Sequence, residues 1–320
     1  MAHYDVFNGD ADGLCALQQL RLAQPREARL VTGVKRDIAL LARVPAQAGD
    51  SVTVLDISLD TNRAALLCLL GRGVAVDYFD HHYAGEVPRH PLLTAHLDPA
   101  PEACTSWLVD RFLQGRHRAW AVVGAYGDGL PATAAGLADA LGLSAPQRQA
   151  LRTLGEAINY NAYGESEADL LVPPAQLARL LRPCADPLAF AAGSAVAHDL
   201  AHRQARDMAL AQGVAPLREL PGATLYLLPD APWARRVQGT FAHALAEREP
   251  GRAHAILCQR GDGAYVVSVR APRQRPQGAE ALCRAFPDGG GRAGAAGIGA
   301  LPRERLEEFL QALSRAWPGP

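Results

Sequence analysis

Short apolar segments alternate with helical segments over the first 80 residues. The apolar segments are residues 4–7, 30–34, 51–55 and 74–78, and the intervening residues 14–22 and 61–70 have apolar side chains at helical spacing. Strands that alternate with helices predict a parallel sheet. Since right-handed crossovers bring the carboxyl ends of such strands to one edge, residues that follow these strands should lie close together.

Three of the four expected strands are followed by carboxylate or imidazole side chains. The first leads to Asp10 and Asp12, the third to Asp56, and the fourth to Asp80-His81-His82. Carboxylate with imidazole is a ligand set for Mn²⁺, Zn²⁺ or Fe²⁺. The competing interpretations are a helix cap for one of the first two aspartates and a surface loop for the two histidines. Two aspartates flanked by glycines exceed what a cap needs, so we expect a metal site at this edge.

Further candidates follow the expected sheet. Asp128 lies in the glycine-rich segment 124–129, which we expect to be a turn. Thr105 and Ser106 could cap a helix that begins at Trp107, and the N-terminus of that helix would be a ready phosphate site. The polar and aromatic segment 159–164 is expected to be a loop, with a cavity wall as the alternative.

A second domain is expected after a long helix. Residues 1–190 should form the catalytic domain, 191–214 a linker helix, and 215–320 a smaller α/β domain with a mixed sheet. This domain contains strand-like residues 224–228, 253–259 and 265–270, the last of which ends in Arg270. Gly289, Gly290 and Gly291 precede Arg292, so backbone N–H groups and a guanidinium could together bind a phosphate. The alternative is a flexible loop.

Composition excludes several classes of protein. The 320 residues are 49% hydrophobic and carry a net charge of −1, which argues against disorder and gives no overall attraction to long duplex nucleic acid. The six cysteines are far apart and suggest neither a disulfide framework nor a zinc ribbon. We find no secretory signal and no stretch of about 20 apolar residues, so we expect a cytoplasmic protein without a membrane partner.

Together these segments resemble the DHH phosphoesterase superfamily. The resemblance covers nearly the whole chain and rests on the order and spacing of short motifs. These are Asp10-Ala11-Asp12-Gly13, Asp56, Asp80-His81-His82, Gly127-Asp128, Ser268-Val269-Arg270 and Gly289-Gly290-Gly291-Arg292. It implies the subgroup with an associated substrate-binding domain, which includes nanoRNases, single-strand exonucleases, cyclic-dinucleotide phosphodiesterases and phosphatases of 3′-phosphoadenosine 5′-phosphate.

The resemblance also implies roles for individual residues and a Mn²⁺ cofactor. Asp12, His81 and Asp128 would bind one ion, Asp56 would bridge two, and Asp10 would bind the other. His82 would meet the scissile phosphate, with Asp80 binding metal or supporting its neighbours. The substrate phosphate would be bound by Arg270, Gly289, Gly290, Gly291 and Arg292.

Two positions depart from the family's pattern. Relatives usually have a histidine four residues before Asp10, where this chain has Val6. The second metal site should therefore be weakened, so one or two ions are expected. His3 cannot substitute without distortion, because its odd separation from Val6 puts it on the opposite face of a strand. Arg292 stands where many relatives have histidine, which suggests an altered grip on substrate.

The function expected from the sequence is a metal-dependent phosphodiesterase or exonuclease. Its substrates would be short single-stranded oligonucleotides or small nucleotides, bound in a cleft between the two domains. The alternatives are a nucleotide-binding or regulatory protein with impaired catalysis, for which Val6 argues, and a nucleotide phosphomonoesterase of the 3′-phosphoadenosine 5′-phosphate type. The oligomeric state stays open, with a homodimer among the alternatives.

Overall fold

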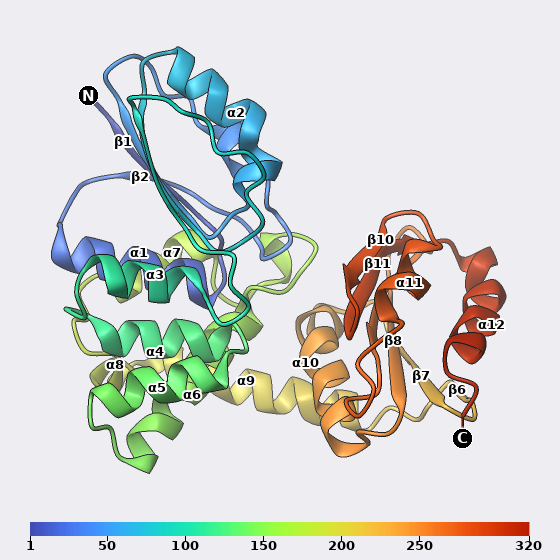
Figure 1. Ribbon diagram of the computed structural model, residues 1–320. Coiled ribbons are helices and arrows are strands. Elements are labelled where there is room, and N and C mark those ends of the chain that lie inside the picture. The colour runs from blue at the N-terminus through green and yellow to red at the C-terminus, as the bar shows by residue number, and fades with distance from the viewer. Residues whose placement is uncertain (320) are drawn as a thin grey trace. The chain divides into compact units, whose positions relative to one another are not determined.

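The computed structural model describes residues 1–319 in two compact units, residues 1–202 and 203–319 (Figure 1). Helix α9 (Ala195–Gln212) contains the point of division, within the segment predicted as a linker helix. No helix among residues 1–319 is long and apolar enough to cross a membrane.

The first unit is built on a fully parallel five-stranded sheet, as predicted. Its strand order is β2-β1-β3-β4-β5. The strands are β1 (His3–Phe7), β2 (Arg29–Val31), β3 (Ser51–Leu55), β4 (Ala75–Asp80) and β5 (Leu93–Leu97). The fifth strand was not predicted from the sequence. It lies at an edge with exposed or half-exposed side chains, so it lacks the buried β-branched and aromatic residues of the central strands.

Helices cover both faces of this sheet (Figure 1). Alternate strand residues, among them Val6 and Val54, pack with η1 (Leu40–Arg43) and α2 (Leu59–Gly71) on one face. On the other face, Phe7, Leu55 and Phe79 join a larger core with the remaining helices. These are α1 (Ala11–Ala23), α3 (Thr105–Phe112), α4 (Arg118–Gly127), α5 (Pro131–Ala140), α6 (Ala145–Asn161), α7 (Pro174–Leu181) and α8 (Pro187–Gly193), with η2 (Glu167–Asp169) following α6.

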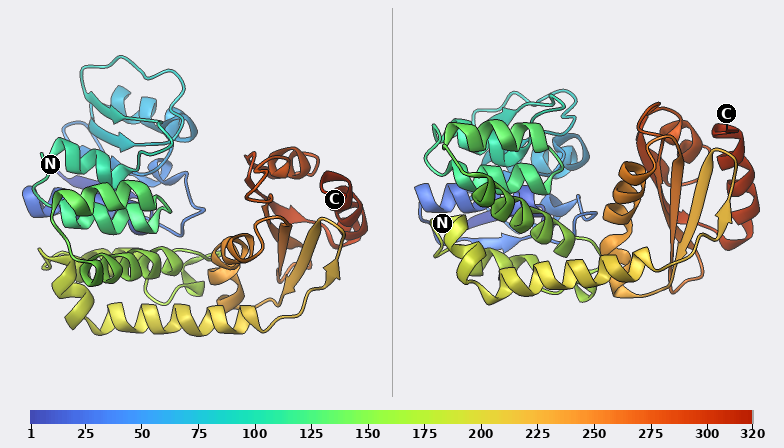
Figure 2. Two further views of the ribbon diagram at one scale, coloured as in Figure 1. Left: turned by 60° about the horizontal axis from the view of Figure 1, so that its bottom comes forward. Right: turned by 90° about the horizontal axis from the view of Figure 1, so that it is seen from below.

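The second unit contains a six-stranded mixed sheet, which confirms the predicted α/β class. Its order is β10-β11-β9-β8-β7-β6, and β7 and β8 form the one parallel pair among these described strands. Helix α10 (Pro232–Arg248) lies on one face, and α11 (Ala279–Arg284) and α12 (Leu306–Ala316) lie on the other (Figure 2). The strands are β6 (Arg218–Glu219), β7 (Ala223–Leu228), β8 (Ala253–Gln259), β9 (Tyr265–Arg270), β10 (Gly289–Arg292) and β11 (Ala295–Leu301), with η3 (Arg303–Arg305) before α12.

The glycine segment Gly289–Arg292 is an edge strand, so the alternative of a flexible loop was wrong. It pairs antiparallel with β11, with Gly289 opposite Ile298 and Arg292 opposite Ala295. Close packing explains two of the glycines. A Cβ at Gly289 would lie 1.7 Å from the carbonyl oxygen of Cys283, and Gly291 has a φ of +143° with only 2.5 Å between such a Cβ and the Cα of Ala296.

Candidate metal centre

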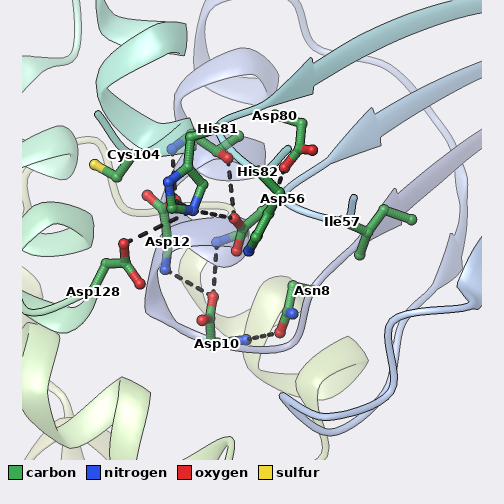
Figure 3. Close-up of polar contacts among 12 residues, drawn as sticks. Asn8, Asp10, Asp12, Asp56, Ile57, Asp80, His81, His82, Cys104 and Asp128 are labelled. Carbon is green, nitrogen blue, oxygen red and sulfur yellow. Dashed lines mark hydrogen bonds and ion pairs between the residues drawn. The ribbon is translucent and has the colours of Figure 1, made fainter. Parts of the chain in front are cut away.

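The carboxyl edge of the first sheet gathers the acidic and histidine side chains predicted there (Figure 3). Asp10 follows β1 as the N-cap of α1, Asp56 follows β3, and Asp80 ends β4. Asp12, Asp56 and Asp80 are almost completely buried. Burial of several carboxylates in one place is costly unless they are paired with cations or hydrogen-bond donors. Their partners therefore decide what this site can hold.

Asp12 is held by the N-terminus of α3. Its two carboxylate oxygens accept hydrogen bonds from the backbone N–H groups of Thr105 (2.6 Å) and Ser106 (2.8 Å). The expected start of this helix at Trp107 and the capping role of Thr105 or Ser106 were wrong, because α3 begins at Thr105 and neither hydroxyl caps it. The carboxylate of Asp12 takes the place at this helix terminus that a phosphate would need.

Asp56 has a backbone conformation that is uncommon for a residue other than glycine. Its φ is +60°, in the left-handed region that aspartate tolerates better than most side chains. The hydroxyl of Thr105 donates to its Oδ1 at 3.1 Å. Burial raises the pKa of Asp56 well above its usual range, and the charges of Asp10 and Asp12 raise it further. A cation at this position would relieve that repulsion.

His81 lies among three of the carboxylates. Its Nε2 is 3.4 Å from Oδ1 of Asp56, 3.9 Å from Oδ2 of Asp128 and 4.0 Å from Oδ2 of Asp12. The potential ligand atoms of Asp12, His81 and Asp128 all lie within 4.8 Å of one another. Two carboxylates and an imidazole are the donor set that Mn²⁺ and related ions accept. The residues present therefore fit a divalent cation.

Asp128 reaches this group from the end of α4. The segment 124–129 was predicted as a turn, but Gly124 to Gly127 form the last turn of the helix and Asp128 is its C-cap. These glycines permit close packing, since a Cβ at Gly124 would lie 2.2 Å from Oγ of Ser106. Burial raises the pKa of Asp128 to about 6, with Asp12 and Asp10 adding to the effect and Lys35 opposing it.

His82 is oriented by Asp80. Its Nδ1 lies 2.7 Å from Oδ1 of Asp80, whose carboxylate is completely buried. The His82 side chain is 42% exposed, whereas that of His81 is 11% exposed. Burial lowers the pKa of His82, but the hydrogen bond and charge of Asp80 outweigh burial and leave that pKa above its usual value. A second ligand group, Asp56 with His81 and His82, also lies within 4.8 Å.

The sequence-based prediction did not include Lys35, which lies at the same edge after β2. Its Nζ is 2.6 Å from Oδ2 of Asp10, 3.0 Å from Oδ1 of Asn159 and 3.8 Å from Oδ1 of Asp128. Burial opposes its charge, but Asp10 and other acidic neighbours raise the pKa of Lys35 well above its usual value. Asn159 is on the last turn of α6, so the expectation that segment 159–164 is all loop was wrong. The signal in the sequence that could have identified Lys35 is its position directly after the second expected strand, residues 30–34.

Val6 is fully buried in an apolar core and offers no metal ligand. His3 does not replace the missing imidazole, as predicted from strand geometry. Its Nε2 lies 3.1 Å from Oδ1 of Asp5 and 3.0 Å from a nitrogen of Arg21. Asp10 belongs to neither of the ligand groups found among residues 1–319.

In the second unit, Arg270 and Arg292 lie in one row of the sheet. Ala295 of β11 pairs with Arg292 of β10 on one side and with Arg270 of β9 on the other. Residues in register on neighbouring strands share a face, so the two arginines are on the same face, about 10 Å apart at their Cα atoms. Gly291 and Ala296 occupy the adjacent row, and Gly290 and Gly297 the row after it. The two arginines therefore lie next to rows of glycine and alanine, whose side chains give little cover.

Comparison with known proteins identifies the fold. No family model matches the chain, and no curated protein sequence does. Among solved structures, exonuclease RecJ bound to manganese superposes with a TM-score of 0.65 at 20% identity, covering 98% of this chain and 90% of that one. The DHH domain of a protein from a family of ribosomal proteins gives 0.64 at 14% identity, with 98% and 86% covered.

A third solved structure is the pGpG-specific phosphodiesterase PggH from Vibrio cholerae. It gives a TM-score of 0.57 at 14% identity, with 99% of each chain covered. All three comparisons extend over both units of this chain. At these identities the likeness establishes the fold, and that fold is the one implied by the sequence resemblance to DHH phosphoesterases.

Proposed function

We propose that this chain is a metal-dependent phosphoesterase that hydrolyses phosphodiester bonds in short single-stranded oligonucleotides or small nucleotides. The observation that carries the proposal is the convergence of Asp12, His81 and Asp128, whose ligand atoms lie within 4.8 Å of one another. A purely structural network of ion pairs does not explain this arrangement. Two carboxylates and an imidazole surround one point, and Lys35 lies within ion-pair distance of Asp128 but not of Asp12.

In this proposal Mn²⁺ is held by Asp12, His81 and Asp128, with Asp56 as a further ligand. When bound, the ion would act as a Lewis acid on a phosphoryl oxygen. The protein's own contribution is to fix the ligands in advance. The backbone of α3 fixes Asp12, and the hydroxyl of Thr105 fixes Asp56. Preorganised ligands bind the ion without the cost of ordering flexible side chains.

His82 is proposed to donate a proton to the leaving oxygen. Its Nδ1 faces Asp80, so the opposite ring nitrogen, Nε2, is the one that can reach a substrate. The greater exposure of His82 than of His81 favours this division of roles between the two histidines. Asp80 acts through His82 by fixing its tautomer and orientation, so we assign it a positioning role.

Substrate phosphates remote from the scissile bond are proposed to bind the second unit at Arg270, Gly289, Gly290, Gly291 and Arg292. The shared face of the two arginines supports this assignment. Paired guanidinium groups suit phosphate, since each can donate two parallel hydrogen bonds. Replacing Arg292 with alanine should raise KM at least about tenfold and leave Mn²⁺ binding unchanged.

The net charge of the chain favours short substrates over long polyanions. The net charge of −1 provides no general attraction for a long polyanion. Two of the similar solved structures are described as an exonuclease bound to manganese and as a pGpG-specific phosphodiesterase. Both descriptions agree with the proposed activity. We therefore place oligonucleotides and dinucleotides first among the substrates to be tested.

The deciding experiment incubates the full chain with Mn²⁺ and a panel of substrates. The panel holds di- to pentanucleotides, cyclic dinucleotides and 3′-phosphoadenosine 5′-phosphate, with products separated by chromatography. Hydrolysis should stop with EDTA, return with Mn²⁺, and be absent from Asp12→Asn. Cleavage of the phosphomonoester alone would favour the phosphatase alternative. If metal binds and none of the panel is turned over, the proposal fails.

A nucleotide-binding protein without catalysis is the second candidate, and the apolar Val6 favours it. In that case the native protein would bind nucleotides without turnover, and Asp80→Ala would retain binding. Isothermal titration with a non-hydrolysable dinucleotide distinguishes the two candidates when it is combined with the turnover assay. The hydrolase is preferred because the other expected ligands are all present and three of them converge.

A further inference from the structure

Lys35 brings a permanent positive charge to the metal centre. Its ammonium nitrogen lies 2.6 Å from Oδ2 of Asp10 and 3.8 Å from Oδ1 of Asp128. Asp10 is 3% exposed, whereas Lys35 is 27% exposed. The buried carboxylate is therefore neutralised by a cation that comes from the chain itself and that still reaches the surface of the site.

The position of Lys35 is fixed from several directions. Its backbone N–H donates to the carbonyl oxygen of Ala162 at 2.8 Å, and its own carbonyl oxygen accepts from the side chain of Asn8 at 3.2 Å. The ammonium group donates to Oδ1 of Asn159 at 3.0 Å and lies 5.6 Å from the ring centre of Tyr163. A side chain held at both its backbone and its tip is a built part of the site.

These contacts leave Asp10 little capacity to bind a metal ion. Its Oδ1 accepts from the backbone N–H groups of Asp12 and Gly13, both at 3.1 Å, and its Oδ2 accepts from Lys35. A divalent ion on Oδ2 would be close to the ammonium on the same oxygen, and two cations at that separation repel strongly in a buried site. Asp10 can therefore hold Lys35 or a second ion, but it cannot hold both well.

The apolar residue Val6 points to the same conclusion by an independent route. The imidazole that the family resemblance implies for a second ion is missing here, and Val6 packs in the core instead. The loss of one ligand and the presence of a fixed ammonium affect the same place. Either the missing imidazole or the fixed ammonium would by itself weaken a second metal site. Together they leave the ammonium of Lys35 in the place of a second ion.

We propose that Lys35 supplies the second positive charge of this centre, so that the chain binds one divalent cation. The ion occupies the site of Asp12, His81 and Asp128, and the ammonium of Lys35 occupies the position next to Asp10. An ammonium group has three N–H donors, of which Asp10 and Asn159 accept two. The third is available to a phosphoryl oxygen of the substrate. This inference rests on the proposed metal-dependent function.

The test measures how many Mn²⁺ ions the full chain binds. Protein equilibrated with excess Mn²⁺ and passed through a desalting column should contain about one Mn²⁺ per chain by elemental analysis. Its electron paramagnetic resonance spectrum should be that of an isolated ion. In Lys35→Met, which keeps the length of the side chain but removes its charge, titration calorimetry should detect a second Mn²⁺. The matched control Arg36→Met changes the neighbouring, exposed cation and should still bind one.

Each outcome separates this inference from the proposed function. Two ions in the native protein, with the spectrum of a coupled pair, would overturn the role of Lys35 and leave the hydrolase proposal intact. A single ion in a folded Lys35→Met variant would also overturn it. No bound Mn²⁺ in the native protein would remove both proposals. The count in the native protein needs no substitution, so the test holds even if the variant fails to fold.

Discussion

Oδ2 of Asp12 lies 2.6 Å from the backbone nitrogen of Thr105, the first residue of α3. A ligand for the proposed metal is thus also the acceptor that satisfies the N-terminus of a helix 93 positions away in sequence. Packing of α1 against α3 and binding of the ion depend on one carboxylate. Substitutions at this residue should therefore affect stability and metal binding together.

We expect Asp12→Asn to destabilise the metal-free protein by about 1–3 kcal/mol, because an amide offers one acceptor oxygen to two buried N–H donors and leaves one unsatisfied. Urea denaturation in EDTA measures this cost. The same variant should lose most of its affinity for Mn²⁺ in titration calorimetry. Unchanged stability would mean that the hydrogen bonds to Thr105 and Ser106 contribute nothing.

Asp128→Asn should have the opposite effect on stability. The pKa of Asp128 is about 6 in the folded chain against 3.8 for an ordinary aspartate. Because the folded-state pKa is raised, this group's contribution is fully present below about pH 4 and is lost as the pH rises through about 6. At pH 7 the metal-free Asn variant should be more stable than the native protein by roughly 1–3 kcal/mol.

Denaturation in EDTA between pH 4 and 7 checks this sign. The difference in stability between the variant and the native protein should grow with pH. The variant should bind Mn²⁺ more weakly than the native protein, because one carboxylate ligand is lost. Addition of Mn²⁺ should stabilise the native chain far more than the variant, since a ligand that binds only the folded state adds to its stability. A variant that is less stable than the native protein at pH 7 would contradict the prediction.

His82→Ala should lower kcat by about 10²–10⁴-fold if His82 acts as the general acid, and should leave the number of bound Mn²⁺ ions unchanged. Asp80→Asn should lower kcat less and shift the acidic and basic limits of the pH–rate profile, because it alters the partner of His82 Nδ1. His243→Ala, an exposed histidine in the second unit, is the matched control. A change in Mn²⁺ number with His82→Ala would instead make His82 a metal ligand.

The parallel sheet could be predicted because its central strands are rich in β-branched and aromatic residues, most of them buried. Residues 51–55 were predicted with the bounds of β3, and the acids after β1, β3 and β4 do lie at one edge. Strand β5 has a sequence, Leu-Thr-Ala-His-Leu, without a buried run. An edge strand takes its pairing from its neighbour, and its own residues give a weak signal.

The pairing of groups within the site could not be predicted in the same way. Asp12 meets Thr105, and Lys35 meets Asn159 across 124 positions of sequence. Neither pair is marked by a local pattern in the sequence, because helix packing brings the partners together. Capping rules favoured Thr105 and Ser106 as caps by their side chains, but an incoming carboxylate satisfied their backbone N–H groups.

The glycines of α4 show the same dependence on packing. Gly124 suggested a turn, yet it is helical and lies against α3. A Cβ there would lie 2.2 Å from Oγ of Ser106, 2.7 Å from its Cβ and 3.2 Å from the Cβ of Cys15. Glycine in a helix interior is unfavourable by itself, so the close approach of the helices is what makes it fit.

We expect Gly124→Ala to destabilise the protein by about 1–3 kcal/mol, because the added methyl group forces α3 and α4 apart. Since the backbone N–H of Ser106 also donates to Asp12, the variant should bind Mn²⁺ more weakly.

Gly136→Ala is the matched control, as Gly136 is exposed on α5 with no atom within 4 Å of an added Cβ. It should gain roughly 0.5–1 kcal/mol from helix propensity and keep its Mn²⁺ affinity. Thermal and urea denaturation of both variants, with and without Mn²⁺, would separate the two effects. Equal gains in stability from the two substitutions would show that α3 and α4 can move apart at no cost, and that Asp12 does not depend on their spacing.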